Sequence, residues 1–146
     1  LVLEKGQLAL VAPGGMREAL RPTTERYQLR WAKRRGFCRL ALETQSPLIL
    51  AACPGADDLY TVYSNRLTKI AYRNLKIPIP LLRGWGPTLL PRPIQLTHVL
   101  SEPIIPATIA GNTPTESQVT ELHEEVQDVM EKTMAIAGLR NPEAVL

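Results

Sequence analysis

The chain has 146 residues and a formal net charge of +3, which is enough for one modest domain with a core of its own. Its two cysteines, Cys38 and Cys53, are too few for a disulfide framework and lack metal-ligand spacing, so we expect reduced thiols and no metal site. The sequence contains no apolar run of about 18 residues, which excludes a predicted membrane-spanning helix.

Three short apolar runs predict β-strands. They are 7–12 (QLALVA), 47–52 (PLILAA) and 94–100 (IQLTHVL). Runs of this length, apolar almost throughout, are typical of strands that are covered on both faces in a parallel sheet. The first run ends at Pro13-Gly14-Gly15, and the second ends at Pro54-Gly55.

Two helical patterns lie between the predicted strands. The segment 36–44 (GFCRLALET) places Phe37, Leu40, Ala41 and Thr44 on one face. The segment 57–75 also has helical spacing, and Asp57 and Asp58 in its first turn would complement the helix dipole.

The clearest predicted element is an amphipathic C-terminal helix over about 114–137. Thr113-Pro114-Thr115-Glu116 predicts a capping box with proline at the first helical position. Gly138 is the predicted stop. The predicted apolar stripe consists of Val119, Leu122, Val126, Val129 and Met130.

Strands that alternate with helices predict an α/β fold with a mostly parallel sheet flanked by helices. Three strands are few for such a sheet, and the first one begins almost at the first residue. We therefore expect 1–146 to be the C-terminal part of one incomplete domain, with further strands before Leu1.

A proline-rich apolar stretch at 77–93 (IPIPLLRGWGPTLLPRP) cannot form a long helix. One interpretation is a loop folded back on the core. The other is contact with a membrane surface or an acyl chain, with Trp85 at the interface and Arg83 and Arg92 facing headgroups.

The Pro13-Gly14-Gly15 turn is the first candidate site. Glycine after a strand lets the backbone approach a ligand closely, and free N–H groups there can hold an anion. Arg17 would add a bidentate cation for phosphate, whereas a plain strand-ending turn is the alternative interpretation. The glycine spacings of dinucleotide sites and phosphate-binding loops are absent.

A basic cluster follows the turn and enters the next predicted helix. It consists of Arg30, Lys33, Arg34, Arg35 and Arg39. It is either a solvated helix face or a surface that attracts acyl-CoA phosphates or anionic headgroups, for which Lys33, Arg34 and Arg35 are the candidates. The short cluster, the balanced charge elsewhere and the 5% aromatic content argue against nucleic acid as a partner.

The segments "VAPGGMREAL" and "RYQLRWAKRRGFCRLALETQSPLILAACPGADDLY" together resemble the glycerolipid acyltransferase superfamily. The resemblance is strongest to its monoacylglycerol/diacylglycerol acyltransferase-like branch, which includes lysophospholipid acyltransferase-like members. The shared order is Gly-Gly-x-x-Glu, a basic turn ending in Gly-Phe, a helix and a strand led by Pro47. It covers 8–60, and more loosely 78–105.

The resemblance implies transfer of a fatty acyl group from acyl-CoA, or acyl carrier protein, to a hydroxyl of a glycerolipid or lipid alcohol. It further implies a membrane-associated protein on the cytoplasmic face, with acyl-CoA as co-substrate and no cofactor. The acceptor stays open among monoacylglycerol, diacylglycerol, lysophosphatidate and long-chain alcohols. By match, the substrate-binding residues are Pro13, Gly14, Gly15, Arg17 and Glu18.

The family's base is the histidine of a His-x-x-x-x-Asp motif that precedes the glycine motif. Histidine titrates near neutrality, and a carboxylate partner fixes its tautomer. No histidine precedes the turn here, so we expect the catalytic pair before Leu1 and no activity from this chain alone. The literal match His123–Asp128 has the wrong order and lies in a helix, where five residues separate the side chains by roughly 140°.

The other histidine, His98, has only Glu102 at the matching offset and is interpreted as a core or edge histidine.

Of two alternative functions, one stays open and one is disfavoured. Without a base, the chain could instead be a non-catalytic membrane- or lipid-binding module derived from the same fold. A serine hydrolase is disfavoured because no Gly-x-Ser-x-Gly is present.

Overall fold

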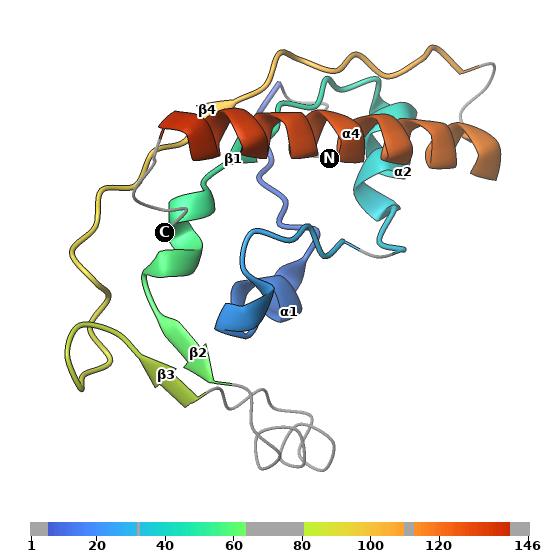
Figure 1. Cartoon of the computed structure of the whole chain (residues 1–146). Helices are drawn as coiled ribbons and strands as arrows, with labels where there is room; N and C mark the ends of the chain where they lie inside the picture. The colour runs from blue at the N-terminus through green and yellow to red at the C-terminus, as the bar shows by residue number, and fades with distance from the viewer. Residues whose placement is uncertain (1–5, 32, 64–80, 110–112, 141–146) are drawn as a thin grey trace, which may run out of the picture.

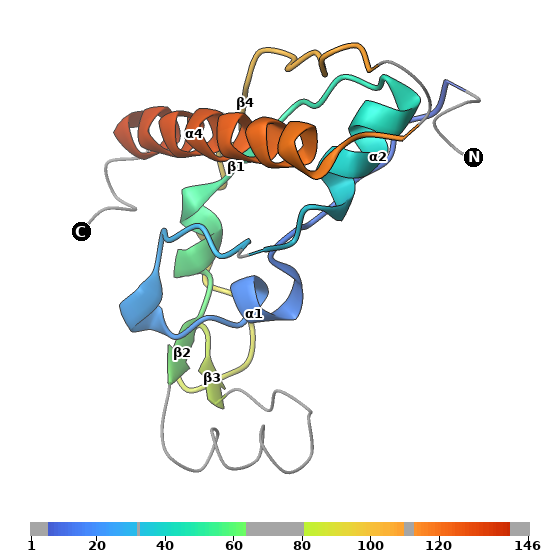
Figure 2. The ribbon, with the colours of Figure 1, turned by 90° about the vertical axis from the view of Figure 1, so that its right-hand side faces the viewer.

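The computed structural model describes residues 6–31, 33–63, 81–109 and 113–140. The longest helix, α4, lies along one side of the molecule, and the β2–β3 pair lies at the opposite end (Figures 1 and 2). Within the described ranges, no helix is long and apolar enough to cross a membrane. The elements are α1 (Gly15–Ala19), η2 (Thr23–Glu25), α2 (Gly36–Thr44), β1 (Ala51–Ala52), η3 (Pro54–Asp58), β2 (Thr61–Tyr63), β3 (Leu81–Arg83), β4 (Val99–Leu100) and α4 (Glu116–Arg140).

Helix α4 begins two residues later than its capping motif predicts. The Thr115 Oγ1 atom accepts a hydrogen bond from the Gln118 N–H at 3.3 Å, and Gln118 Oε1 accepts one from the Thr115 N–H at 2.9 Å. This reciprocal pair is a capping box that starts at Thr115 rather than at Thr113. Pro114 therefore precedes the cap instead of opening the helix.

The apolar stripe of α4 forms the centre of the main core. Val119, Leu122 and Val126 are buried, and Val129 and Met130 pack against the same cluster, which confirms the predicted stripe. The stripe meets α2 and the β1–β4 pair, so one helix covers both. A second, smaller cluster of Ala52, Val99 and Ala137 continues this contact toward the C-terminal half of α4.

Helix α2 has the predicted bounds, 36–44, but it turns a different face inward. The buried residues are Cys38, Ala41 and Leu42, whereas Phe37, Leu40 and Thr44 are half-buried. Gln45 ends the helix in the left-handed conformation at φ 50°, and its N–H bonds back to the last turn. Burial raises the pKa of the Cys38 thiol to about 11.

The second and third predicted strands pair with each other, but they run antiparallel. Ala51 pairs with Leu100 and Ala52 with Val99, and an isolated bridge joins Leu48 to Ile104. Between these contacts, residues 49–50 of one strand lie opposite residues 101–103 of the other, so the register shifts by one residue, as in a β-bulge. The Ser101 hydroxyl fills the gap by accepting the Leu50 N–H at 3.0 Å.

The described chain between β1 and β4 differs from the predicted one. Asp57–Asp58 end the short 3-10 helix η3, and 61–63 form strand β2. The predicted helix over 57–75 is therefore wrong at its start, and its remainder from 64 onward lies outside the described residues. Strand β2 pairs antiparallel with β3. Strand β3 lies within the proline-rich stretch 77–93.

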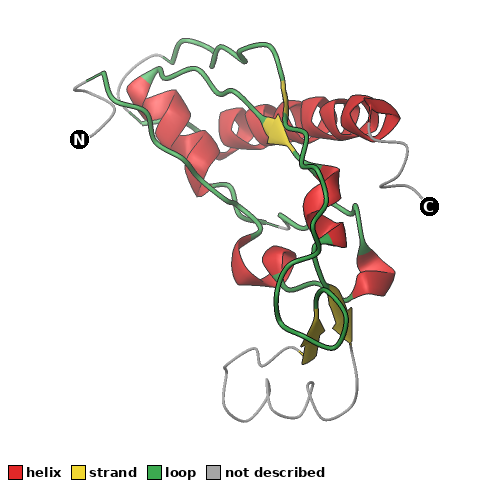
Figure 3. Ribbon diagram, turned by 90° about the vertical axis from the view of Figure 1, so that its left-hand side faces the viewer, coloured by secondary structure: helices red, strands yellow, loops and turns green. Residues whose placement is uncertain are grey.

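The first predicted strand, 7–12, has no strand partner among the described residues. All six residues are exposed, including Leu8 and Leu10, which are 98% and 99% exposed. A continuous apolar run forms a buried strand only when neighbours cover it, and the described chain supplies none. The described residues contain both helices and strands, as the predicted α/β class requires. Both described sheets are antiparallel pairs of strands, however, where a mostly parallel sheet was predicted (Figure 3).

Substitution Leu42→Ala tests the packing between α2 and α4. Leu42 is 1% exposed, so we expect truncation to lower the free energy of unfolding by about 2–5 kcal/mol. Leu10→Ala, at a fully exposed leucine, serves as the control and should change it by less than about 0.5 kcal/mol. Equal effects of the two variants in urea denaturation would contradict this core.

Candidate functional site

The Pro-Gly-Gly turn, residues 12–15, needs both of its glycines. The Gly15 N–H donates to the Ala12 carbonyl at 3.1 Å, and Gly15 adopts φ +54°, a left-handed conformation that favours glycine. Gly14 is buried against Glu18, and a Cβ atom at Gly14 would overlap the Glu18 side chain. The turn therefore brings the backbone and the Glu18 side chain close together as α1 begins.

Two side-chain contacts hold the Pro-Gly-Gly turn in place. The Arg34 guanidinium donates to the Pro13 carbonyl at 2.7 Å and also to the Gly14 carbonyl. Glu18 accepts the backbone N–H of Arg30 at 3.1 Å. The turn is thus tied to the basic cluster, which lies far from it in sequence.

Asp57 and Asp58, here called the acidic pair, anchor the chain that leaves α1. Arg21 forms an ion pair with Asp57 at 3.3 Å, and the Tyr27 N–H donates to the same carboxylate at 2.7 Å. Tyr27 has φ +60°, so a left-handed backbone position presents its N–H to Asp57. Arg21 also donates to the carbonyls of Glu18 and Gln28, which closes the loop between them.

Asp58 collects a second set of partners. The Tyr27 hydroxyl donates to its two oxygens at 3.0 and 2.8 Å, and Arg26 forms an ion pair with it at 3.1 Å. Burial, with this hydrogen bond to Asp58, raises the pKa of Tyr27 to about 12. Arg92 donates to the Asp58 carbonyl at 2.8 Å and to Thr61, so it is bound inward and not toward a headgroup.

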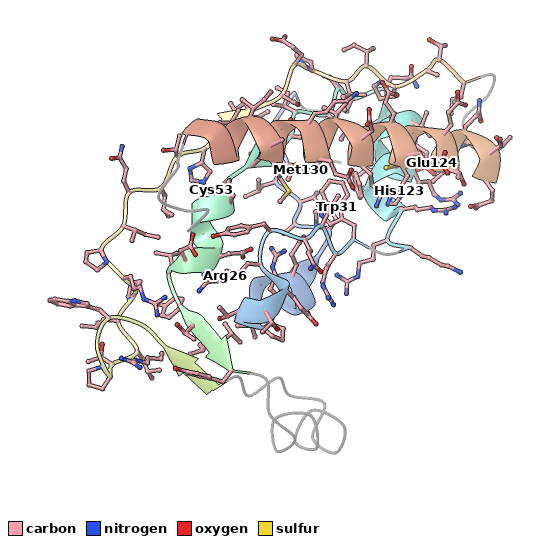
Figure 4. The ribbon with its side chains drawn as sticks, in the orientation of Figure 1. Arg26, Trp31, Cys53, His123, Glu124 and Met130 are labelled. Carbon is pink, nitrogen blue, oxygen red and sulfur yellow. The ribbon has the colours of Figure 1, made fainter. Side chains whose placement is uncertain are left out.

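The sequence predicts Asp57 and Asp58 as helix-dipole partners and predicts no role for Arg21, Arg26 or Tyr27. The available signal was the run of basic and aromatic residues in RPTTERYQLR, which lies next to a glycine turn. Spacing alone could not pair these residues with carboxylates about 30 positions further along. Only the folded chain brings 21–27 beside η3, as the position of Arg26 in Figure 4 illustrates.

The residues of the basic cluster differ in the partners that they contact. Arg34 is bound to the Pro-Gly-Gly turn, Arg35 donates to Thr120 Oγ1 at 2.7 Å, and Arg39 pairs with Glu116. Arg30 pairs with Glu25 at 2.8 Å. Lys33 is exposed and forms no hydrogen bond or ion pair with the described part of the chain. Most of the cluster therefore joins α2 and the turn to other parts of the chain.

His123 lies on the inward face of α4, in a cluster of rings (Figure 4). It is 3% exposed, its ring lies 6.1 Å from that of Phe37, and Phe37 in turn meets Trp31 edge-on at 5.6 Å. Burial lowers the pKa of His123, the positive charge of Arg35 lowers it further, and Glu124 opposes the shift. Its Nε2 atom has no hydrogen-bond partner among the described residues.

Among the residues that the structure describes, neither histidine pairs with a carboxylate. Asp128 pairs with Lys132 at 2.6 Å on the exposed face of α4, away from the buried ring of His123. His98 and Glu102 are both exposed. The described residues also include no group of three or more His, Cys, Asp or Glu side chains that could hold a metal ion.

The sequence that forms this turn and the elements after it matches a known family over nearly the whole chain. The family model described as "Diacylglycerol acyltransferase" matches residues 2–135. This chain belongs to the diacylglycerol acyltransferase family. No solved structure matches it.

Curated relatives agree with this family. The chain is 29% identical over 145 residues to the human "DGAT1/2-independent enzyme synthesizing storage lipids", and 29% identical over 103 residues to the chicken protein of that name. These matches cover 94% and 70% of this chain. An uncharacterized protein of Mycobacterium leprae is 28% identical over 148 residues and 96% of the chain. The chain spans only 29% to 40% of the length of these relatives.

Substitution Asp57→Asn tests the contact between the acidic pair and the 21–27 segment. Loss of the charge leaves the largely buried Arg21 guanidinium without its ion-pair partner, so we expect the free energy of unfolding to fall by about 1–3 kcal/mol. The control Asp128→Asn removes an exposed pair within one helix and should cost less than about 0.5 kcal/mol. If urea denaturation gives the same small change for both, Asp57 does not anchor this segment.

Acidification tests the burial of His123. Because its folded pKa lies below the unfolded value, protonation favours unfolding: stability is retained above about pH 6.5 and falls as the pH drops below it. We expect the melting temperature of His123→Gln to depend less on pH between pH 7.5 and 5 than that of the parent. His98→Gln, at an exposed histidine, should keep the parent's dependence, and a profile flattened equally by both variants would contradict the assignment.

Proposed function

We propose that this chain is the C-terminal portion of an acyltransferase of the glycerolipid acyltransferase superfamily. The enzyme would transfer a fatty acyl group from acyl-CoA, or acyl carrier protein, to a hydroxyl of a glycerolipid or lipid alcohol. The observation that carries the proposal is the family match over residues 2–135, which spans the glycine turn, α2, the acidic pair and most of α4. The relatives named as enzymes that synthesize storage lipids support the same chemistry.

The proposed substrate-binding segment is Pro13, Gly14, Gly15, Arg17 and Glu18. Its support is the close approach of Gly14 to Glu18 and the fixation of the turn by Arg34, which together give a rigid backbone edge. A fixed edge can position a lipid headgroup without paying the entropy of ordering a loop at each turnover. Glu18 acts there as a positioning residue, since it accepts the Arg30 N–H.

The reaction needs a base that removes the proton of the acceptor hydroxyl, so that its oxygen attacks the thioester carbonyl and the coenzyme A thiolate leaves. The two histidines of the chain, His98 and His123, both follow the glycine turn, and neither meets a carboxylate in the described structure. We therefore assign the base to a His-x-x-x-x-Asp pair outside these residues.

The acyl-CoA and headgroup contacts proposed for Lys33, Arg34 and Arg35 differ in their support. Lys33 is exposed, and its ammonium group can meet a phosphate without breaking a contact within the described chain. Arg34 already donates to the glycine turn and Arg35 to Thr120. They would therefore attract the phosphates through their positive charge rather than contact them directly. The proposed location is the cytoplasmic face of a membrane, where both acyl-CoA and the lipid acceptor are reached.

Acyl transfer is tested with the whole reading frame that contains these residues, expressed in membranes and given radiolabelled acyl-CoA. Monoacylglycerol, diacylglycerol, lysophosphatidate and a long-chain alcohol are offered separately as acceptors. We expect Gly14→Ala to lower kcat/KM on the order of 10²-fold, because the added Cβ displaces Glu18 and the turn. Lys132→Ala, on the exposed face of α4, is the matched control and should retain activity within about twofold.

Three outcomes of this assay matter. Transfer to none of the acceptors, by a protein that binds lipid, would favour the non-catalytic membrane- or lipid-binding module instead. Unchanged activity of Gly14→Ala would exclude the turn from substrate binding. The 146-residue chain alone should show no transfer, and turnover that His123→Ala abolishes would overturn the assignment of the base.

A further inference from the structure

The loop that follows β3 holds three large apolar side chains in water. In the Trp85 loop, residues 84–90, Trp85 is 63% exposed, Leu89 is 72% exposed and Leu90 is 60% exposed. Figure 1 shows this segment at the outer edge of the molecule, beside the β2–β3 pair and opposite α4. A grouped set of exposed apolar side chains on a soluble surface marks an interaction site more often than a scattered one does.

Hydrogen bonds fix the shape of the Trp85 loop. The Gly84 N–H donates to the Thr88 carbonyl and the Trp85 N–H to the Leu90 carbonyl, both at 2.8 Å. The Thr88 hydroxyl donates to the Trp85 carbonyl at 2.7 Å. A Cβ atom at Gly84 would overlap the Leu90 carbonyl, so only glycine permits this closure. The apolar side chains are therefore displayed by a built loop.

The charges around the loop select its partner. No Asp or Glu occurs between Asp58 and Glu102 in the sequence. Arg83, next to the loop, is exposed, and its Nε donates to the Gly86 carbonyl at 2.8 Å, which places a cation at the base of the apolar tip. Indole and leucine side chains beside a cation, with no carboxylate near in sequence, match the headgroup region of an anionic bilayer.

We propose that the Trp85 loop inserts into the surface of a membrane that contains anionic phospholipid. Trp85, Leu89 and Leu90 enter the boundary between headgroups and acyl chains, and Arg83 stays at the headgroup level. This inference rests on the proposed function, because a lipid acceptor brings the enzyme to such a surface. It assigns the contact to one loop of the fold rather than to the basic cluster, most of which is bound within the protein.

Vesicle binding by the whole chain, without any acyl donor, tests the insertion. The probe is vesicles of phosphatidylcholine with phosphatidylglycerol, and the readouts are co-sedimentation and tryptophan emission. Trp31 is 3% exposed and Trp85 is 63% exposed, so a blue shift on vesicle addition reports Trp85. We expect a blue shift, quenching by lipids brominated on their acyl chains, and binding that is weaker to pure phosphatidylcholine.

The variant pair Leu89→Ser/Leu90→Ser should weaken binding by about tenfold or more, since it removes the apolar area that enters the bilayer. The matched control is Leu8→Ser/Leu10→Ser, which changes two leucines that are even more exposed. Equal losses from both pairs, or binding without a Trp85 shift, would overturn the proposal. Oligomers that form without vesicles and disappear in the Leu89/Leu90 variant would assign the loop to contact with a second copy instead.

The outcome of the vesicle-binding experiment does not depend on whether the protein transfers acyl groups. A protein that binds vesicles through the Trp85 loop but transfers no acyl group contradicts only the proposed function. One that transfers acyl groups, with vesicle binding that the loop variants leave unchanged, contradicts only this inference.

Discussion

The burial of one stripe of α4 is the contact on which the rest of the structure depends. Val119, Leu122 and Val126 pack with residues of α2 and with Leu50 and Ile104. Further along the helix, Ala137 packs with Ala52 of β1 and Val99 of β4. Two-residue strands have little stability of their own, so their position is set by this apolar cover. The helix in turn needs the cover, because an isolated amphipathic helix gains most of its stability from packing.

Charge plays a second, connecting role. The arginines that the sequence offers as a headgroup surface are largely used inside the chain: Arg34 holds the glycine turn, Arg39 reaches α4, and Arg21 meets Asp57. Guanidinium groups suit this task because they donate several hydrogen bonds in a fixed plane. The glycine turn is thereby held in one geometry, while Lys33 and the Trp85 loop stay exposed.

Two of the segments that expose apolar side chains differ in kind. Leu8 and Leu10 lie in an extended run that pairs with no described strand, whereas Trp85, Leu89 and Leu90 lie in a loop closed by its own hydrogen bonds. A run with open backbone groups on both edges suits addition to a sheet, and a closed loop does not. This distinction is why the loop, and not the run at 7–12, is assigned to a lipid surface.

The sequence by itself determined the elements whose signals are local. Periodicity over α4 and the Gly-Phe start of α2 predicted both helices, because apolar spacing and caps act within a few residues. The order of motifs from the glycine turn to 47–52 also predicted the family, since that order is a property of the chain and not of its fold. The same order of motifs also led to Gly14 and Gly15 of the turn as predicted substrate-binding residues.

Only the tertiary structure decided which partners these elements meet. The β1–β4 pair is antiparallel where a parallel sheet was predicted, and η3 and β2 replace the start of a predicted helix. The inward face of α2, the ring cluster around His123 and the ties from Arg21 and Tyr27 to the acidic pair join residues tens of positions apart. Such contacts follow from the global packing of apolar surface and the pairing of buried charge, which no local pattern encodes.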